Sequence, residues 1–436
     1  MTFADAEAYL LRLPSFSAIG GAAYVPGFER IEALLAGMGD PHRALRIAHV
    51  AGTNGKGSTA SMLASIGTAA GKRMGLHTSP HLYRLNERMR IDGVPIPDEQ
   101  LAVLVARHAA LIERVRPSFF EATVALSLLH FAEEAVDAAV VEVGLGGRLD
   151  ATNIVSPAVC AITTIGLEHT AFLGDTIEAI AAEKAGIVKP GVPVVCSVEQ
   201  PSAVEVVRRI AHRQAAPFHG LDDEVTIAEL SAAISGITMD VTTPQRMYAG
   251  LFLALPGRFQ ARNAALATRV AELFFEDEMA GSGAAVYRGM RQVRRLSGLR
   301  GRLEVLAQEP LIVQDVGHNH DGLSASLAFM NEQLAGSGGR LFVVFGVMRD
   351  KDIDRMAQLL KTAEAHVVLV PISVERALPP PELADRLSRH VLSIHRSASV
   401  EDALMWFRRQ ATPDDGLLIT GSHFVASQIL PQLDPN

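Results

Sequence analysis

The stretch HVAGTNGKGSTASML, residues 49–63, contains the residue types that bind a phosphate chain. Backbone N–H groups approach a polyphosphate closely only where no side chain intervenes, and glycines at 52, 55 and 57 meet this need. Lys56 adds a point charge for the outer phosphates. Ser58 and Thr59 offer hydroxyl groups to a magnesium ion at the predicted start of a helix. The pattern predicts an ATP-binding loop, and a plain Gly-rich turn between strand and helix is the alternative.

This loop departs from the usual G-x-x-x-x-G-K-[ST] spacing at two positions. Val50 stands where the first glycine is expected, and Gly57 follows Lys56 where a hydroxyl residue is expected. The missing glycine does not exclude phosphate binding. We expect Gly57 to widen the turn between the lysine and the hydroxyl groups.

Short apolar runs and longer helical patterns alternate around the loop and must position it. Strands are predicted at 47–51, 74–78, 138–144, 158–165 and 192–198, and helices at 58–71, 98–115, 121–135 and 176–188. Continuous apolar strands separated by helices indicate a mostly parallel sheet that helices cover on both faces. Asp92-Gly93 lies between two strand-like pieces and predicts a hairpin.

A second alternating series follows a stretch rich in Thr, Ser and Gly at 222–255, which predicts short antiparallel strands. A helix is expected at 263–275, and the later apolar runs lie at 310–316, 340–347, 365–370 and 416–422. We therefore predict an α/β fold with two domains. Residues 1–296 would form a P-loop ATPase domain with a mostly parallel sheet, and residues 297–436 a smaller Rossmann-like α/β domain.

Composition excludes several classes of protein. The net charge of -8 gives no electrostatic footprint for nucleic acid. No apolar run reaches the roughly 18 residues that a membrane span needs. The N-terminal segment carries acidic residues early, unlike a signal peptide. Cys160 and Cys196 lie in apolar runs, which is typical of buried thiols in a reduced cytoplasmic chain.

Three further residues have types that suit a catalytic centre. Glu142 ends a predicted strand, and ligands of open α/β sheets bind at the carboxyl ends of strands, so it is a candidate magnesium ligand. The alternative is a solvated acid at a strand end. His169 follows another strand and Lys184 lies in a helical pattern; taken alone, each would be an ordinary surface or core residue.

The loop GTNGKGS resembles the nucleotide loop of the Mur ligase superfamily, and the glycine after the lysine resembles its folate branch, folylpolyglutamate synthase and dihydrofolate synthase. Other motifs of that branch follow in order along the whole chain. They are TSPHL (78–82), NERMRIDG (86–93), FFEATVALSL (119–128), VVEVGLGGRLDATN (140–153), LEHTAFLGDTIEAIAAEKAGIVKPG (167–191), LPGRFQARNAALA (255–267), GRLEV (301–305), QDVGHNHDG (314–322), FGVMRDKDI (345–353) and LLITGSHFVA (417–426). Each motif is modest evidence, but the ordered set is specific.

The resemblance implies a role for each matching residue. The implied catalytic residues are Lys56, Glu142, His169 and Lys184. The implied ATP contacts are Thr53, Asn54, Gly55, Lys56, Gly57, Ser58, Asn263, Arg302, Asp315 and His318. The implied ligands of two Mg²⁺ ions are Ser58, Ser79, Glu142 and His169. The implied folate contacts are Ser79, Pro80, His81, Phe120, Glu121, Thr123, Leu149, Asp150 and Ala151.

Lys184 is implied to be carbamylated (N6-carboxylysine), because an anion there suits a neighbouring magnesium ion better than an ammonium group. The family usually reads D-x-A-H-N-P where this chain has Asp315-Val316-Gly317-His318-Asn319-His320. The small residue and the His-Asn pair are kept, so we expect the turn to be intact without its proline.

The resemblance implies an ATP-dependent ligase that phosphorylates the carboxylate of dihydropteroate or of a reduced folate. The amine of L-glutamate would then displace phosphate from the acyl phosphate. The motifs leave open which of the two acceptors is used, and the C-terminal domain would close over ATP. We expect a cytoplasmic monomer with no nucleic-acid or membrane partner.

Two other functions are the alternatives. The first is a Mur-type amino-acid ligase of cell-wall synthesis. Gly57 argues against this function. Only about 45 residues precede the loop, which are too few to form a separate UDP-binding domain. The second is a nucleotide-dependent ATPase switch, which would hydrolyse ATP with neither acceptor nor amino acid present.

Overall fold

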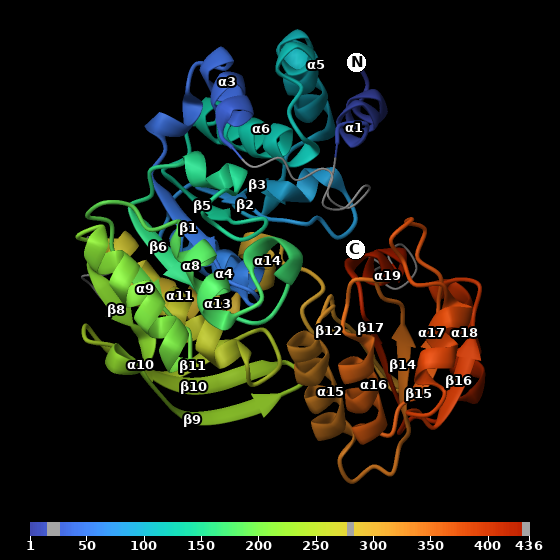
Figure 1. The fold of residues 1–436 in the computed structure, drawn as a ribbon. Coiled ribbons are helices and arrows are strands. Elements are labelled where there is room, and N and C mark those ends of the chain that lie inside the picture. The colour runs from blue at the N-terminus through green and yellow to red at the C-terminus, as the bar shows by residue number, and fades with distance from the viewer. Residues whose placement is uncertain (15–26, 277–282, 430–436) are drawn as a thin grey trace. The chain divides into compact units, whose positions relative to one another are not determined.

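The computed structural model describes residues 1–14, 27–276 and 283–429, which form two compact units (Figure 1). The first unit comprises Met1–Ser231, Ile237–Ala254 and Gln260–Leu299. The second comprises Arg300–Asn436 and two short segments, Ala232–Gly236 and Leu255–Phe259. Each unit is described by itself below.

An eight-stranded sheet forms the centre of the first unit, with the order β4-β3-β2-β5-β1-β6-β7-β8. Neighbouring strands from β2 to β8 pair in parallel, whereas β3 and β4 form an antiparallel hairpin at the edge. The predicted mostly parallel sheet is therefore confirmed. Its strands are β1 (Ile47–Ala51), β2 (Met74–His77), β3 (Met89–Ile91), β4 (Val94–Pro95), β5 (Ala138–Glu142), β6 (Val159–Ile162), β7 (Val194–Cys196) and β8 (Phe218–Gly220).

Helices pack against both faces of this sheet. One face is covered by α3 and α6, whose apolar side chains form a buried cluster with β1 and β5, and by α8 and α9, which pack on β6 and β7. Helix α4 packs with α11 and α13. The helices are α1 (Phe3–Leu11), α3 (Glu29–Gly37), α4 (Lys56–Ala69), α5 (Asp98–Val115), α6 (Phe119–Glu133), α7 (Thr170–Leu173), α8 (Ile177–Ala185), α9 (Pro201–Arg213), α10 (Leu221–Glu224), α11 (Gln260–Phe274), α13 (Ala284–Arg291) and α14 (Val293–Ser297), with 3-10 turns η2 (Pro41–Ala44), η3 (Leu85–Arg88) and η4 (Ala151–Ile154).

Helix α4 begins at Lys56, two residues earlier than predicted. Gly55 is its N-cap and has a φ of 83°, a left-handed conformation that glycine adopts without steric cost. Gly57 therefore lies buried in the first helical turn, and the expectation that it widens a turn was wrong. The left-handed cap ends the loop before Lys56, so the hydroxyls of Ser58 and Thr59 lie inside the helix rather than at its first position.

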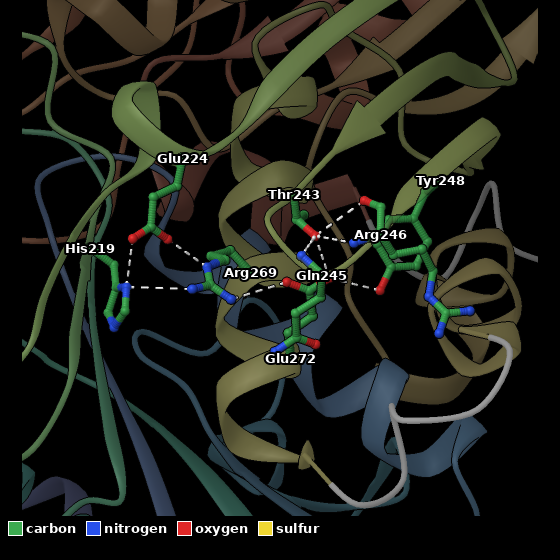
Figure 2. A network of polar contacts seen from close by, with 8 residues as sticks. All are labelled: His219, Glu224, Thr243, Gln245, Arg246, Tyr248, Arg269 and Glu272. Atoms are coloured by element: carbon green, nitrogen blue, oxygen red, sulfur yellow. Dashed lines mark hydrogen bonds and ion pairs between the residues drawn. The ribbon is translucent and has the colours of Figure 1, made fainter.

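A small sheet with the order β11-β10-β9 contains the short strands that were predicted for residues 222–255. A buried polar network connects this sheet with α11 (Figure 2). Its strands are β9 (Thr226–Ala233), β10 (Gly236–Thr242) and β11 (Met247–Leu253). Glu272 has no exposed surface and accepts hydrogen bonds from Thr243 Oγ1 at 2.6 Å and Tyr248 Oη at 3.0 Å. Arg269 donates to Glu272 at 3.2 Å and to Glu224 at 2.7 Å. The network thus connects α11 with the small sheet on one side and with the end of α10 on the other.

The second unit has a six-stranded sheet with the order β12-β13-β17-β14-β15-β16, parallel except for β12. Apolar clusters lie on both faces, one with α15, α16 and α17 and the other with α18 and α19. The predicted Rossmann-like arrangement is confirmed. Its elements are β12 (Glu304–Gln308), β13 (Leu311–Gln314), α15 (His320–Leu334), β14 (Leu341–Phe345), α16 (Ile353–Thr362), β15 (His366–Leu369), α17 (Pro380–Leu387), β16 (Ser393–Arg396), α18 (Val400–Gln410), β17 (Gly416–Thr420), α19 (His423–Ala426) and η5 (Ser427–Ile429).

Within the described ranges, no helix combines the length and the apolar character that crossing a bilayer requires.

Candidate functional site

Four neighbouring parallel strands of the first unit end at one edge of the sheet, in the order β2-β5-β1-β6. Parallel strands share the direction of their carboxyl ends, which is where open α/β sheets bind ligands. Ser79 follows β2, Glu142 is the last residue of β5, and the loop 52–55 follows β1. His169 lies beyond β6. The fold therefore brings four predicted site segments, far apart in sequence, to the same edge.

The loop after β1 is shaped by contacts with the end of β6. Gly52 has a φ of 151°, and a Cβ atom there would lie 1.7 Å from Thr163 Oγ1. Thr163 donates to the carbonyl of Asn54 at 2.6 Å, and the amide of Asn54 donates to Thr164 Oγ1 at 3.0 Å. Thr53 accepts from the amide of Gly166 at 3.0 Å. The loop is thus fixed in shape by its neighbour strand.

Asn263, which the family pattern implied as an ATP contact, lies directly against this loop. A Cβ atom at Gly55 would be 2.4 Å from Asn263 Oδ1, so only glycine allows this approach. Gln260 accepts from Asn263 Nδ2 at 2.9 Å and donates to Ser58 Oγ at 3.4 Å. The N-terminal end of α11 therefore lies beside the loop, and the buried network of Figure 2 holds the C-terminal half of the same helix.

Two lysines converge on one carbonyl oxygen. Lys56 Nζ donates to Gly52 O and to Thr53 O, both at 2.9 Å, and Lys184 Nζ donates to the same Gly52 O at 2.8 Å. Burial, together with the charge of Lys56, lowers the pKa of Lys184 to about 7. Two ammonium groups at one oxygen repel each other, so Lys184 loses its proton more readily than an ordinary lysine.

Glu142 is buried, and its Oε2 accepts a hydrogen bond from the amide of Ser79 at 3.0 Å. This bond connects the end of β5 with the segment TSPHL after β2. The carboxylate and the Ser79 residue are therefore neighbours, as the predicted metal site requires. Pro80 is exposed, and Ser79 and His81 are partly exposed.

Glu87 holds the segment after Ser79, a role that the sequence analysis did not predict. Its carboxylate accepts from the backbone amides of Leu82 at 2.8 Å and of Tyr83 and Arg84 at 2.9 Å. One carboxylate that binds three consecutive amides gives the backbone of the segment a defined shape. We call residues 79–84 the acceptor loop from here on.

Arg88 is a second residue that the sequence analysis missed. It is buried, and its Nε donates to His81 Nδ1 at 2.9 Å. Its guanidinium group lies 5.0 Å from the ring centroid of Phe119. Burial lowers the pKa of Arg88 to about 10, against the opposing effect of Glu142 and Glu87, so it stays a cation at neutral pH. The neighbouring cation and burial lower the pKa of His81 to about 3.

Helix α6 places Phe120 near the site, whereas the side chains of Glu121 and Thr123 make hydrogen bonds within the protein. Phe120 lies under Gly144, where a Cβ atom would be 2.4 Å from its ring. Glu121 accepts from the amide and hydroxyl of Ser118 at 2.7 Å, which forms the capping box of the helix. Thr123 has no exposed surface and donates to the Phe120 carbonyl at 3.0 Å. Both side chains have partners within the protein, and their predicted folate contacts stay predictions.

Asp150 is also buried and acts within its own turn. Its carboxylate accepts from the amide of Leu145 at 2.8 Å and from the amide of Thr152 at 3.0 Å. Burial raises its pKa, against these hydrogen bonds. Ala151 is nearly buried, whereas Leu149 is partly exposed. The pattern indicates that Asp150 shapes the GLGGRLDA turn, and that Leu149 is the residue of this trio best exposed to a ligand.

His169 is the N-cap of α7 and has a left-handed backbone with a φ of 53°. Its Nε2 lies 4.0 Å from Glu168 Oε1, and both side chains are partly exposed. The neighbouring residues Leu167 and Phe172 are also exposed. The segment after β6 thus presents an imidazole at the same edge of the sheet.

Arg302, Asp315 and His318 belong to the second unit, so their predicted role toward ATP stays a prediction. Asp315 accepts from the amides of Leu303 at 2.9 Å and Gly317 at 2.8 Å, and burial raises its pKa. His318 lies with its ring centroid 5.6 Å from that of His423.

His320 takes the position where the family usually has proline. It is the first residue of α15, a place where proline would preorganise the backbone. Asn319 caps the helix by accepting from the amide of Gly322 at 2.9 Å, so the turn is intact without the proline.

Among the described residues, no group of three or more His, Cys, Asp or Glu side chains could hold a metal ion by itself. Mg²⁺ is commonly bound by one or two carboxylates together with substrate phosphates and water. One buried carboxylate, Glu142, beside a hydroxyl residue and a phosphate-binding loop suits that mode of binding. The donor set therefore fits magnesium that arrives with ATP rather than a preformed protein cage.

Comparison with known proteins agrees with this arrangement. The model of the Mur ligase middle domain matches residues 50–271, and that of the Mur ligase glutamate ligase domain matches residues 301–423. Dihydrofolate synthase/folylpolyglutamate synthase of Bacillus subtilis (strain 168) is 35% identical over 416 residues, which are 94% of this chain and 95% of the relative.

Solved structures are similar over nearly the whole chain. Mycobacterium tuberculosis folylpolyglutamate synthase complexed with ADP has a TM-score of 0.89 at 30% identity, covering 98% of this chain and 96% of that one. An FPGS–AMPPCP–folate complex has a TM-score of 0.83 at 32% identity, covering 98% of each chain. The chain belongs to the dihydrofolate synthase/folylpolyglutamate synthase family, in the folate branch of the Mur ligase superfamily.

Proposed function

We propose that this protein is an ATP-dependent ligase that joins L-glutamate to a pteroate-type acceptor, namely dihydropteroate, a reduced folylpolyglutamate, or both. One observation carries the proposal: the phosphate-binding loop, Glu142 and the acceptor loop lie at the ends of three adjacent strands. A nucleotide and an acceptor acid bound there would meet at the carboxylate of Glu142. The ADP and AMPPCP–folate complexes of relatives support the same pair of ligands.

The reaction has two steps. A carboxylate oxygen of the acceptor attacks the γ-phosphorus of ATP, and ADP leaves. The amine of L-glutamate then attacks the acyl carbon, loses a proton, and expels inorganic phosphate that contains one oxygen of the original carboxylate. Phosphoryl transfer of this kind depends mainly on positioning and charge neutralisation, so no nucleophilic side chain is required.

The residues of the first unit supply that positioning. The loop amides and Lys56 would bind the phosphates, and Asn263 would contact the nucleotide where it passes the loop. Ser58, Ser79, Glu142 and His169 would hold two Mg²⁺ ions, which supply Lewis-acid neutralisation of the phosphoryl oxygens. Arg302, Asp315 and His318 are proposed nucleotide contacts from the second unit.

Lys184 is proposed to be carbamylated. Its neutral amine adds to carbon dioxide and releases one proton, leaving a carbamate anion. The lowered pKa supports this step because only the neutral amine is nucleophilic. The product would replace the repulsion between Lys184 and Lys56 by attraction, since the two groups share one carbonyl oxygen.

We further propose a cytoplasmic monomer. Cys160 and Cys196 are free and buried thiols, as is typical of a reducing compartment. Gel filtration with and without ligands measures the oligomeric state.

The experiment that tests the function follows a labelled oxygen. Dihydropteroate and tetrahydrofolate, each labelled with ¹⁸O in the acceptor carboxylate, are offered separately with ATP, Mg²⁺ and L-glutamate. Mass spectrometry of the products should show a glutamate adduct and one ¹⁸O in inorganic phosphate. Unlabelled phosphate beside the adduct would refute the acyl phosphate. Steady ATP hydrolysis with neither acceptor nor glutamate would instead favour the ATPase switch.

A further inference from the structure

Arg88 is a buried cation whose guanidinium group donates a hydrogen bond from Nε but none from its two terminal nitrogens to a described protein atom. The residue is 6% exposed, its Nε donates to His81 Nδ1 at 2.9 Å, and one face covers the ring of Phe119 at 5.0 Å. Among the described residues, neither of its two terminal nitrogens donates to a protein atom. Both terminal nitrogens have some solvent-accessible surface. The small exposed part of Arg88 is therefore its terminal edge.

The other arginines of the same segment are arranged differently. Arg84 is exposed and pairs with both carboxylate oxygens of Asp98 at 2.7 Å. Arg90 is buried, but its terminal nitrogens reach Glu87, one donating to the carbonyl at 2.7 Å and the other lying 3.6 Å from the carboxylate. An open terminal edge on a nearly buried guanidinium thus distinguishes Arg88 from both neighbours.

Burying a cation costs free energy unless its N–H groups find partners. The two terminal nitrogens of a guanidinium group present parallel N–H groups that match the two oxygens of a carboxylate. His81 fixes the Nε side of Arg88 and Phe119 fixes its plane, so the open edge is held in one orientation. Such an edge is prepared for a planar anion rather than for a single neutral acceptor.

The position of Arg88 connects this edge with the reacting groups. His81, its partner, belongs to the acceptor loop, and Ser79 of that loop donates its amide to Glu142 at 3.0 Å. The carbonyl of Arg88 accepts from the amide of Thr78 at 3.3 Å, next to Ser79. Arg88 also acts electrostatically on Glu142, so it lies close to the end of β5. The cation is thus beside the place where the acceptor acid must be activated.

We propose that Arg88 binds the carboxylate of the acceptor acid and holds it for phosphorylation. The inference rests on the proposed function, because it assumes that this acid is the substrate. Arg88 would keep the carboxylate oriented, with its positive charge also limiting repulsion between the acid and Glu142. Once one carboxylate oxygen is phosphorylated, the planar anion that the guanidinium edge fits no longer exists.

The test compares an acid with its ester. Equilibrium dissociation constants of dihydropteroate and of its methyl ester are measured with the wild-type protein, in the presence of a non-hydrolysable ATP analogue and Mg²⁺. Loss of a charge-assisted hydrogen-bonded pair corresponds to about 10–100-fold in affinity. Wild-type protein should therefore prefer the acid by at least about tenfold, and Arg88→Gln should reduce this preference to within about threefold. Ester binding should be unchanged.

Two further variants make the result decisive. Arg107→Gln removes an exposed arginine of α5 that pairs with Glu133, outside the acceptor loop, and should keep the full preference for the acid. Arg88→Lys keeps the charge but not the paired N–H groups, so it should bind the acid more weakly than wild type and the ester equally well. It provides the same comparison if Arg88→Gln does not fold, which circular dichroism shows.

The outcomes separate the two proposals. Equal weakening of acid and ester in the Arg88 variants would overturn the inference, because it indicates a purely structural role through His81. An unchanged preference for the acid would overturn it as well. If the wild-type protein binds neither compound, the proposed function itself fails and the inference falls with it.

Discussion

Replacing His49 by glutamine should flatten the pH dependence of the stability of the first unit. His49 lies in β1 just before the phosphate-binding loop, has no exposed surface, and contacts Thr152 Oγ1 through Nε2 at 2.9 Å. Burial, together with the nearby Lys189 and His77, lowers its pKa to about 3. His77 lies across β5 in register with it, since both pair with Val141. The folded state therefore keeps His49 neutral.

The sign and size of the effect follow from proton binding. An unfolded histidine has a pKa of about 6.5, so the unfolded state binds a proton that the folded state refuses. The stability from His49 is complete above pH 6.5 and is lost progressively as the pH falls from 6.5 toward 3. Between pH 7.5 and 5.5 the loss is about 1.4 kcal/mol. This value depends only on the unfolded pKa, as long as the folded pKa is well below 5.5.

Urea unfolding at pH 7.5 and 5.5, followed by circular dichroism, measures this loss. Trp406 is the single tryptophan of the chain and lies in α18, so its fluorescence identifies the transition of the second unit. The stability of His49→Gln should fall by about 1.4 kcal/mol less than that of the wild type. His212→Gln, which changes an exposed residue at the end of α9, is the control and should behave like the wild type. An equal loss in wild type and His49→Gln would refute the reasoning.

Three other substitutions have definite expected outcomes. Glu142→Gln should lower kcat on the order of 10²-fold with an unchanged melting temperature, because the amide oxygen still accepts the bond to the acceptor loop; a steady-state assay with a parallel melt checks this, and unchanged kcat would contradict the metal assignment. Gly52→Ala should abolish nucleotide binding in calorimetry because its Cβ would clash with Thr163, whereas Gly71→Ala, at a φ of 86° that is also positive but with open space around the Cβ, should bind ATP normally. Glu272→Gln should destabilise the first unit by about 3 kcal/mol in urea, since a buried ion pair loses one partner; a loss below about 1 kcal/mol would make the network of Figure 2 dispensable.

The sequence predicts well those elements whose pattern is local. The apolar run 47–51 is β1 residue for residue, and the amphipathic pattern 98–115 is α5 with the same bounds. The start of α4 was placed too late because a glycine in the left-handed conformation at 55 cannot be distinguished by type from the glycines beside it. No strand was predicted at 393–396, since β16 is an edge strand with half-exposed side chains and lacks an apolar run.

The candidate site shows the same division. The proposed phosphate-binding loop is contiguous, so residue types and spacing are enough to predict it. Lys184 meets the carbonyl of Gly52 across 132 residues, which only the fold can bring about. Glu87 and Arg88 lie in a charged run that is typical of a solvated surface. The burial of Arg88 and the partial burial of Glu87 follow from the hairpin of β3 and the 3-10 turn before it. Charged side chains that fold inward to serve a loop leave no periodic signal in the sequence.

Glu87 gives the enzyme a means to diversify. The hydrogen bonds that this carboxylate makes with the acceptor loop all come from main-chain amides, which are identical whatever side chains the loop carries. Substitutions at 83 and 84 can therefore alter the chemistry of the loop surface while its path is preserved. Substitution of a few side chains of the acceptor loop can therefore change which acid binds there, while the proposed phosphate-binding residues on the neighbouring strands stay the same.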